Sequence, residues 1–288
     1  MTRRSGARNP APELCRQPGV GRTRLLDLAK LLHRRSMSLN RRRFCFIAAG
    51  TLVSLPFGAG CDALTFPASA AAARLKARPK PGSKTTATGR STLNLGGARD
   101  GILQMPATIP AGRLPLLVLF HGAGGSGERQ LQRFGSIPDE TGVPVLALDS
   151  RGPTWDAIRG GFGPDIEFID RALDKVFGQV AIDPTEVVAG GFSDGATYAL
   201  SLGLANGDLF QRIVAWSPGF IVDDRPQGKP RIFISHGTKD EILPIDSCSR
   251  VLVPALRKRG YDVTYKEFDG PHTVPAELAT EGFKFAKA

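Results

Sequence analysis

The chain has 288 residues, 41% of them hydrophobic and 23% charged, so it is long enough for one large or two small globular domains with a sizeable core. Its formal net charge of +11 would on its own suggest a protein that binds nucleic acid or a membrane surface. Residues 1–90, however, carry a net charge of +15, whereas residues 91–288 carry −4. The basic residues belong to an N-terminal leader, and we expect no nucleic-acid partner for the mildly acidic remainder.

Residues 37–73 have the pattern of an export signal. The basic cluster Arg41–Arg43 precedes an apolar run, 44–59, that is shorter than the about 20 residues of a membrane span, and small residues follow it. The sequence NRRRF resembles a twin-arginine signal, which exports folded proteins. We therefore expect a periplasmic or secreted protein; the alternative is an N-terminal membrane anchor that is not cleaved. Because Met37 begins this segment, residues 1–36 are interpreted as an upstream extension from a misplaced start.

Two processing sites compete at the end of the signal. The sequence Ala68-Ser69-Ala70 suits a signal peptidase that requires small side chains. The segment Gly58–Cys61 resembles a lipoprotein box, in which Cys61 would be acylated and would attach the protein to a membrane. The box departs from the usual pattern because its first residue is Gly rather than Leu or Val. Both outcomes stay open.

Residues 74–90 are basic and rich in Pro, Gly and Thr, a composition that predicts a flexible linker. The folded domain is therefore expected over residues 91–288. Of the four cysteines only Cys248 lies in that domain, so the sequence offers neither a disulfide framework nor a cysteine metal site. We expect no cofactor and no metal.

Short apolar runs alternate with helix-like stretches through residues 91–288. Buried strands are expected at 114–120, 143–149, 186–192, 212–217 and 230–236, with an edge strand at 263–268. Helices are expected at 165–178, at 194–205, at 246–259 with an interruption at Pro254, and at 275–287. Nearly continuous apolar runs suit strands that are buried on both faces of a parallel sheet. The alternation predicts an α/β fold with a doubly wound, mostly parallel sheet, whose functional residues follow the carboxyl ends of the strands.

The strand at 186–192 leads into a helix through the sequence GFSDG, which contains Ser193. This G-x-S-x-G pattern is typical of a nucleophile elbow, a sharp strand-to-helix turn that lifts a serine hydroxyl above the sheet. Gly191 and Gly195 leave room for the turn and for close packing of the helix on the strand. Taken alone the pattern is weak evidence, since an ordinary strand–helix turn also contains Gly and Ser. The hydroxyl becomes nucleophilic only when a base reaches it.

A candidate acid and a candidate base follow Ser193 in the order that such an elbow requires. Asp240 lies in the loop after the strand at 230–236, and Glu241 and Asp246 are rival acids nearby. His272 lies in a Gly-Pro loop after the last predicted strand. It is the only histidine that follows both other residues in the chain. We therefore predict Ser193 as the nucleophile, His272 as the base and Asp240 as the acid that orients it.

The glycine-rich turn GAGGSG after the first long strand is expected to supply an oxyanion hole. Ala123 is the predicted backbone N–H donor of this turn, with Gly124 as the alternative, and Asp194 supplies the second N–H. The same turn also satisfies G-x-G-x-x-G, and Asp149 ends the next strand, as in a dinucleotide-binding loop. That alternative, an oxidoreductase, explains one loop, whereas the hydrolytic interpretation explains four.

Four segments, FHGAGGSG, GGFSDGA, HGTKDEILPI and DGPHTVPAE, together resemble the α/β-hydrolase fold over residues 91–288. Within that fold the chain resembles the small lidless phospholipase/carboxylesterase group and the polyhydroxybutyrate-depolymerase-like esterases. The resemblance implies a serine esterase that cleaves a small or lipid-like carboxylic ester through an acyl-enzyme on Ser193. Asp194 stands where the carboxylesterase group often has Gln, a departure that is tolerated because the backbone N–H acts there. A non-catalytic binding protein on the same scaffold is a further alternative, and it would predict a broken triad.

The substrate pocket is the part that the sequence defines least. Aromatic residues near the ends of strands are candidates to line it, and each is equally well explained as a core or rim residue. These candidates are Trp155, Phe162, Trp216 and Phe220. Little sequence separates Trp216 from Lys229, so we expect no large lid, which favours short or exposed acyl groups.

Overall fold

The computed structural model describes residues 73–83, 87–222 and 225–287, which all lie in the second of two units into which the chain divides, Thr65–Ala288. The extension at 1–36 and, apart from Ala73, the signal predicted over 37–73 lie outside the described residues. In the part that the structure describes, no helix has both the length and the apolar character needed to cross a bilayer.

An eight-stranded sheet forms the centre of the described part, in the order β1-β2-β4-β3-β5-β6-β7-β8. The strands are β1 (Gly89–Thr92), β2 (Gly101–Met105), β3 (Leu114–Phe120), β4 (Val145–Leu148), β5 (Ile182–Phe192), β6 (Arg212–Trp216), β7 (Arg231–Gly237) and β8 (Val263–Phe268). Strand β2 pairs antiparallel with both β1 and β4, and every other pairing is parallel. The predicted α/β fold with a mostly parallel sheet is confirmed.

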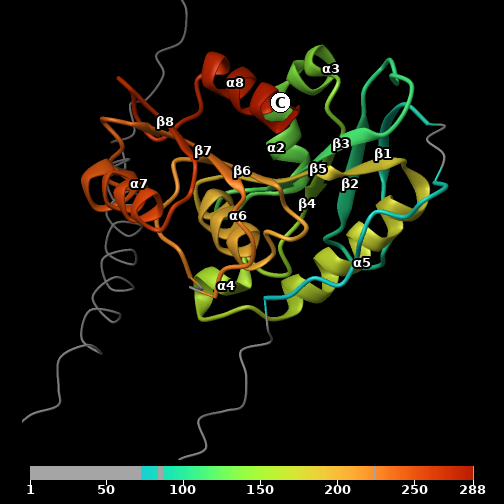
Figure 1. The fold of residues 1–288 in the computed structure, drawn as a ribbon, viewed down its shortest axis with the longest axis horizontal. Helices are drawn as coiled ribbons and strands as arrows, with labels where there is room; N and C mark the ends of the chain where they lie inside the picture. The colour runs from blue at the N-terminus through green and yellow to red at the C-terminus, as the bar shows by residue number, and fades with distance from the viewer. Residues whose placement is uncertain (1–72, 84–86, 223–224, 288) are drawn as a thin grey trace, which may run out of the picture. The chain divides into compact units, whose positions relative to one another are not determined.

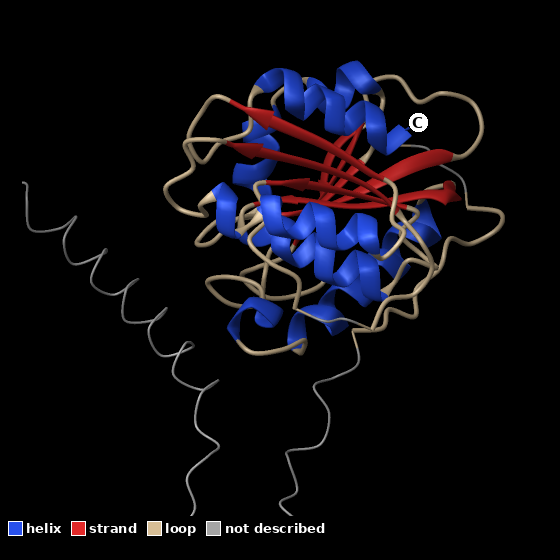
Figure 2. Cartoon of the chain, turned by 60° about the vertical axis from the view of Figure 1, so that its left-hand side comes forward, coloured by secondary structure: helices blue, strands red, loops and turns tan. Residues whose placement is uncertain are grey.

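Helices cover both faces of the sheet (Figures 1 and 2). They are α2 (Gly127–Phe134), α3 (Ile137–Thr141), α4 (Asp156–Arg159), α5 (Pro164–Gln179), α6 (Asp194–Ala205), the short 3₁₀ turn η1 (Ile245–Ser247), α7 (Ser249–Lys258) and α8 (Ala276–Lys287). Strand β3 is buried along its whole length, and its side chains alternate between two core clusters. Val118 and Phe120 pack with α5 and α6, whereas Leu117 and Leu119 pack with α2 and α8. This two-sided burial explains why the strand has a continuous apolar sequence.

The predicted strands and helices are all present, and their ends differ from prediction by a few residues. Five elements were not predicted: β1, β2, α2, α3 and α4. The interruption expected at Pro254 is wrong, because α7 continues through this residue. Proline removes one backbone hydrogen bond of the helix. Val253 and Leu256, which flank it, are buried in the core and hold the helix in place.

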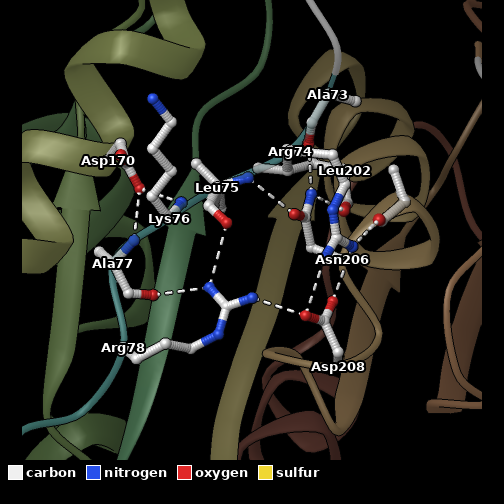
Figure 3. A network of polar contacts seen from close by, with 11 residues as sticks. Ala73, Arg74, Leu75, Lys76, Ala77, Arg78, Asp170, Leu202, Asn206 and Asp208 are labelled. Carbon is white, nitrogen blue, oxygen red and sulfur yellow. Dashed lines mark hydrogen bonds and ion pairs between the residues drawn. The ribbon is translucent and has the colours of Figure 1, made fainter.

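The flexible linker predicted over 74–90 is wrong for residues 74–83, which together with Ala73 form a docked segment that we call the N-terminal arm. Leu75 is buried, and its N–H donates to Asn206 Oδ1 at 2.8 Å (Figure 3). The backbone N–H groups of Lys76 and Ala77 both donate to Asp170 Oδ1, at 2.7 and 2.8 Å. An extended segment satisfies its backbone donors only through outside partners. Here those partners are side chains on α5 and at the end of α6.

Charged side chains of the arm add a second, exposed set of contacts. Arg74 pairs with Asp208 at 2.8 Å and Arg78 pairs with the same carboxylate at 2.5 Å, each from a half-exposed position. The strand β1 then begins within the predicted linker, at Gly89. The folded domain therefore begins at Ala73 among the described residues, rather than at the predicted residue 91.

Candidate active site

The turn between β5 and α6 places Ser193 in a strained backbone conformation, with φ of 60° and ψ of −122°. A non-glycine residue at positive φ of this kind costs about 1–3 kcal/mol and marks a site where the surroundings impose the geometry. Close approaches explain the two flanking glycines. A Cβ atom on Gly195 would lie 2.1 Å from the Phe120 carbonyl oxygen, and one on Gly191 would lie 2.3 Å from the Gly195 carbonyl oxygen. The β5–α6 turn has the strained geometry and close packing expected of a nucleophile elbow.

Three side chains from three separate loops meet above this turn. His272 Nε2 lies 2.8 Å from Ser193 Oγ, and His272 Nδ1 lies 2.6 Å from Asp240 Oδ2. Since a carboxylate only accepts, Nδ1 carries a proton and Nε2 is left to accept from the serine hydroxyl. The structure thus brings together the three residues that the sequence singled out, in the orientation that lets His272 take a proton from Ser193.

Hydrogen bonds from several directions hold the carboxylate of Asp240, which is fully buried. Its Oδ1 accepts the backbone N–H groups of Ile242, at 3.0 Å, and Leu243, at 2.8 Å. Its Oδ2 lies 3.2 Å from Nε2 of His236, a buried histidine at the end of β7. That nitrogen also donates to the Leu243 carbonyl, and burial lowers the pKa of His236, so the ring is neutral. His236 closes β7 and braces the backbone of the loop that carries Asp240.

The rival acids lie away from the histidine. Glu241 is exposed. Asp246 is also exposed and pairs with Arg250 at 2.7 Å. Only Asp240 among the three contacts His272.

The glycine-rich turn packs directly against the elbow, since a Cβ on Gly122 would lie 3.3 Å from the Cβ of Ser193. The Gly124 N–H donates to the Pro153 carbonyl at 2.7 Å and is therefore occupied. In the residues that the structure describes, no backbone carbonyl accepts from the N–H of Ala123 or of Asp194. These two N–H groups, which the sequence predicted as oxyanion donors, are the ones left available for a ligand.

The side chain of His121 holds the glycine-rich turn through a hydrogen bond to its backbone. Its Nε2 accepts from the Ser150 N–H at 3.1 Å, so its Nδ1 carries the proton and donates to the Gly122 carbonyl at 2.7 Å. Arg99 also contacts Nε2, at 3.1 Å, and donates to the Gly125 carbonyl. Burial is the main cause that lowers the pKa of His121, which keeps the ring neutral. His121 and the partly buried Arg99 thus hold the carbonyl groups of Gly122 and Gly125 in the turn.

The structure argues against the dinucleotide-binding alternative, because the carboxylate of Asp149 that would bind the ribose already has a partner. The Asp149 carboxylate accepts the backbone N–H of Gly127, the first residue of α2, at 2.7 Å. A ribose-binding carboxylate would have to be free to accept from the ligand. The loop instead faces Ser193.

A cleft of about 390 Å³ opens above the serine. It is lined by Gly122–Ser126 of the glycine-rich turn, His121, Arg129, Gln130, Arg133, Phe192, Ser193, Ile242 and His272. The lining residues of α2 were not singled out in the sequence, because α2 itself was not predicted.

None of the four aromatic residues predicted for the pocket lines this cleft. Trp155 and Trp216 are fully buried core residues, whose indole N–H groups donate to the carbonyls of His121 and Leu278. Phe162 is also buried in the core. Phe220 is 47% exposed but lies outside the cleft. The sequence placed these aromatics near strand ends without indicating toward which side each one packs.

Comparisons with known proteins agree with this geometry. Residues 161–280 match the model of the Phospholipase/Carboxylesterase family. Two solved structures are similar over most of their own length. Esterase PE8 is 20% identical, with a TM-score of 0.54 over 66% of this chain and 98% of that chain. S-formylglutathione hydrolase FrmB from Staphylococcus aureus is 14% identical, with a TM-score of 0.58 over 71% of this chain and 98% of that chain. The chain has the α/β-hydrolase fold.

A curated relative of this chain is "Putative esterase NocK" from Nocardia uniformis subsp. tsuyamanensis, which is 29% identical over 184 residues. The match covers 59% of this chain and 53% of that protein, so the chain spans about half the length of this relative. The resemblance to the phospholipase/carboxylesterase group is confirmed by the family match, which includes Ser193, Asp240 and His272. These findings support an esterase or serine hydrolase function. The resemblance to polyhydroxybutyrate-depolymerase-like esterases stays a prediction.

The described part of this chain contains no group of three or more His, Cys, Asp or Glu that could hold a metal ion. Cys248 is buried, and burial raises the pKa of its thiol.

Proposed function

We propose that the chain is a carboxylic ester hydrolase that works through an acyl-enzyme on Ser193. The observation that carries this proposal is the continuous chain of contacts from Ser193 Oγ to His272, at 2.8 Å, and from His272 to Asp240, at 2.6 Å. A hydroxyl, an imidazole and a buried carboxylate in this order form the arrangement that activates a serine.

In the proposed reaction, Ser193 Oγ attacks the ester carbonyl while His272 Nε2 takes its proton. Asp240 accepts from Nδ1 throughout and stabilises the imidazolium that forms. The backbone N–H groups of Ala123 and Asp194 donate to the oxyanion of the tetrahedral intermediate, and each donor is worth about 2.7–4 kcal/mol of transition-state stabilisation. The imidazolium then protonates the departing alcohol. Water repeats the same steps on the acyl-enzyme and releases the acid.

The natural ester belongs to the class of small or lipid-like molecules. The cleft is open to solvent at the exposed side chain of Ile242. The connection between β6 and β7, of which the structure describes residues 217–222 and 225–230, contains no helix that could cover it. These features favour short acyl groups, or groups that extend out of the cleft.

Hydrolysis of p-nitrophenyl esters, from acetate to long acyl chains, tests the proposal on the full chain. The variant Ser193→Ala should lower kcat by about four to six orders of magnitude, and His272→Ala by a similar factor, because the triad acts as a unit. Ser91→Ala is the matched control, since Ser91 is an exposed residue of β1. Circular dichroism should show that all three variants keep the fold.

The outcome separates the proposal from its alternatives. Equal rates for the native chain and Ser193→Ala would show that Ser193 is not the nucleophile. If the native chain hydrolyses no ester but still binds one, the protein is a binding module on a hydrolase scaffold. NAD binding to the glycine-rich turn would revive the oxidoreductase interpretation.

We also propose that the protein is exported to the periplasm or secreted by a twin-arginine signal at residues 37–73, with cleavage near Ala70 or lipidation at Cys61. The basic cluster and the apolar run of the sequence support this. Replacing Arg41 and Arg42 by Lys should abolish export in a host that has the twin-arginine pathway, whereas the same change at Arg34 and Arg35 should not. Unchanged export of the first variant would refute the proposed signal.

A further inference from the structure

Three residues of one helix line the catalytic cleft, and each side chain carries hydrogen-bond donors. Arg129, Gln130 and Arg133 all belong to α2 and all line the cleft that also contains Ser193 and His272. Spacings of three and four residues place them on one side of the helix. This side of α2 faces the position that a bound ester would occupy.

The charge of the cleft is one-sided. Its lining contains two guanidinium groups and neither Asp nor Glu. Among the described residues, no carboxylate forms an ion pair with Arg129 or Arg133, although Glu128 of the same helix pairs with Arg90 at 2.9 Å. Unpaired arginines beside a cleft attract an anion into it.

Arg133 is held close to the reacting groups. Its guanidinium carbon lies 4.5 Å from the centre of the Phe192 ring, in the geometry of a cation–π contact. The Phe192 ring in turn lies 4.7 Å, centre to centre, from the ring of His272. A single aromatic side chain therefore separates the positive charge from the catalytic imidazole, and the contact orients the guanidinium before any ligand arrives.

The side-chain nitrogen of Gln130 lacks a hydrogen-bond acceptor, which is an observation independent of the two arginines. Its side chain is 3% exposed, and its Nε2 is buried without a hydrogen-bond acceptor among the described residues. Buried N–H groups in native proteins are nearly always bonded, and this unbonded one belongs to a residue that lines the cleft, where an acceptor that enters with a ligand would satisfy it. The amide and the two guanidinium groups all donate hydrogen bonds, and although Arg129 Nη1 already contacts the Gly124 carbonyl at 3.5 Å, both exposed guanidinium groups keep donors for a ligand oxygen.

We propose that Arg129, Gln130 and Arg133 bind an anionic oxygen group of the ester, a carboxylate or a phosphate, so that the preferred substrates are negatively charged esters. This inference rests on the proposed esterase function and names its substrate class. The planar guanidinium matches both carboxylate and phosphate oxygens. The anionic group occupies the α2 side of the cleft while the ester carbonyl lies at Ser193.

A pair of substrates that differ only in charge tests the inference. The p-nitrophenyl monoester of glutaric acid carries a terminal carboxylate where p-nitrophenyl valerate carries a methyl group, and both release the same phenol. Uncatalysed rates are subtracted, because the glutarate carboxylate can attack its own ester. We expect kcat/KM to be about ten- to a hundredfold higher for the glutarate ester, the value of charge-assisted hydrogen bonds.

Charge removal should abolish this preference. In Arg133→Gln and in the double variant with Arg129→Gln, the ratio of the two kcat/KM values should fall toward one, and effects on steps common to both esters cancel in that ratio. Arg171→Gln is the matched control, since Arg171 is an exposed residue of α5 outside the cleft. Added salt should lower the preference of the native chain. Glutarate and inorganic phosphate, as competitive inhibitors of valerate hydrolysis, show which of the two anions binds better.

Different results would refute the esterase function and the anion site. If neither ester is hydrolysed, the esterase function itself is wrong. If both are hydrolysed with equal kcat/KM, or if the glutarate preference persists in the folded double variant, the esterase stands and the anion site is refuted.

Discussion

The docking of the N-terminal arm yields a stability prediction whose size follows from its contacts. The Asn206 side chain is fully buried, its Oδ1 accepts the Leu75 N–H at 2.8 Å, and its Nδ2 donates to the carbonyls of Ala73 and Leu202. In Asn206→Ala the backbone groups of Ala73 and Leu75 lose these partners while they stay buried. Each buried group left without a partner costs about 1–3 kcal/mol, so the free energy of unfolding should fall by about 2–4 kcal/mol.

Urea unfolding followed by circular dichroism measures this change, and Asp208→Ala is its control. Asp208 pairs with two arm arginines, but its side chain is 40% exposed, and such pairs contribute about 0–1 kcal/mol. Limited trypsin digestion should also cut the arm faster in Asn206→Ala, because the arm contains two trypsin sites, after Arg74 and after Lys76. An unfolding free energy within about 0.5 kcal/mol of the native value in Asn206→Ala, or an equal loss in both variants, would refute the reasoning.

Further predictions concern the elbow and the buried histidines. Gly195→Ala should lower the unfolding free energy by about 3 kcal/mol or more and reduce activity, because its Cβ meets the Phe120 carbonyl and forces β3 and α6 apart. Gly178→Ala on α5, where a Cβ meets nothing within 4 Å, should instead stabilise by about 0.5–1 kcal/mol; equal effects would contradict the packing argument. Burial lowers the folded-state pKa of both His121 and His236, so their contribution to stability is complete above the unfolded pKa of about 6.5 and is lost as the pH falls below it. Each contributes a slope of up to about 1.4 kcal/mol per pH unit, and His236→Gln should remove one such slope in urea titrations from pH 5 to 7.5; an unchanged slope would show that His236 is not held neutral.

Much of the site could be predicted because its parts carry local signals. Ser193, Asp240 and His272 follow recognisable strands, and the carboxyl ends of parallel strands meet at one edge of a sheet. A strand buried on both faces, such as β3, has a continuous apolar sequence, so its position was also predictable.

The missed features depend on partners that are remote in the sequence. The arm has the composition of a linker, and only the distant side chains of Asp170 and Asn206 turn it into a docked segment. Helix α2 is short and mostly polar, and it buries few apolar side chains, Leu131 and Phe134 among them. Trp155 and Trp216 stand beside strand ends in the sequence, but the side toward which a side chain packs is decided by the tertiary fold.

The arm also sets an order of events in folding. Its partners Asp170, Asn206 and Asp208 lie 93 to 134 residues beyond the segment that binds them. During synthesis the arm leaves the ribosome before α5 and α6, yet it cannot dock until these two helices have been made and packed. Contacts of such long sequence separation close late, after the local β–α units have formed. The first part of the folded domain to be synthesised is thus among the last to be fixed in place, and a protease-resistant arm reports that the domain has finished folding.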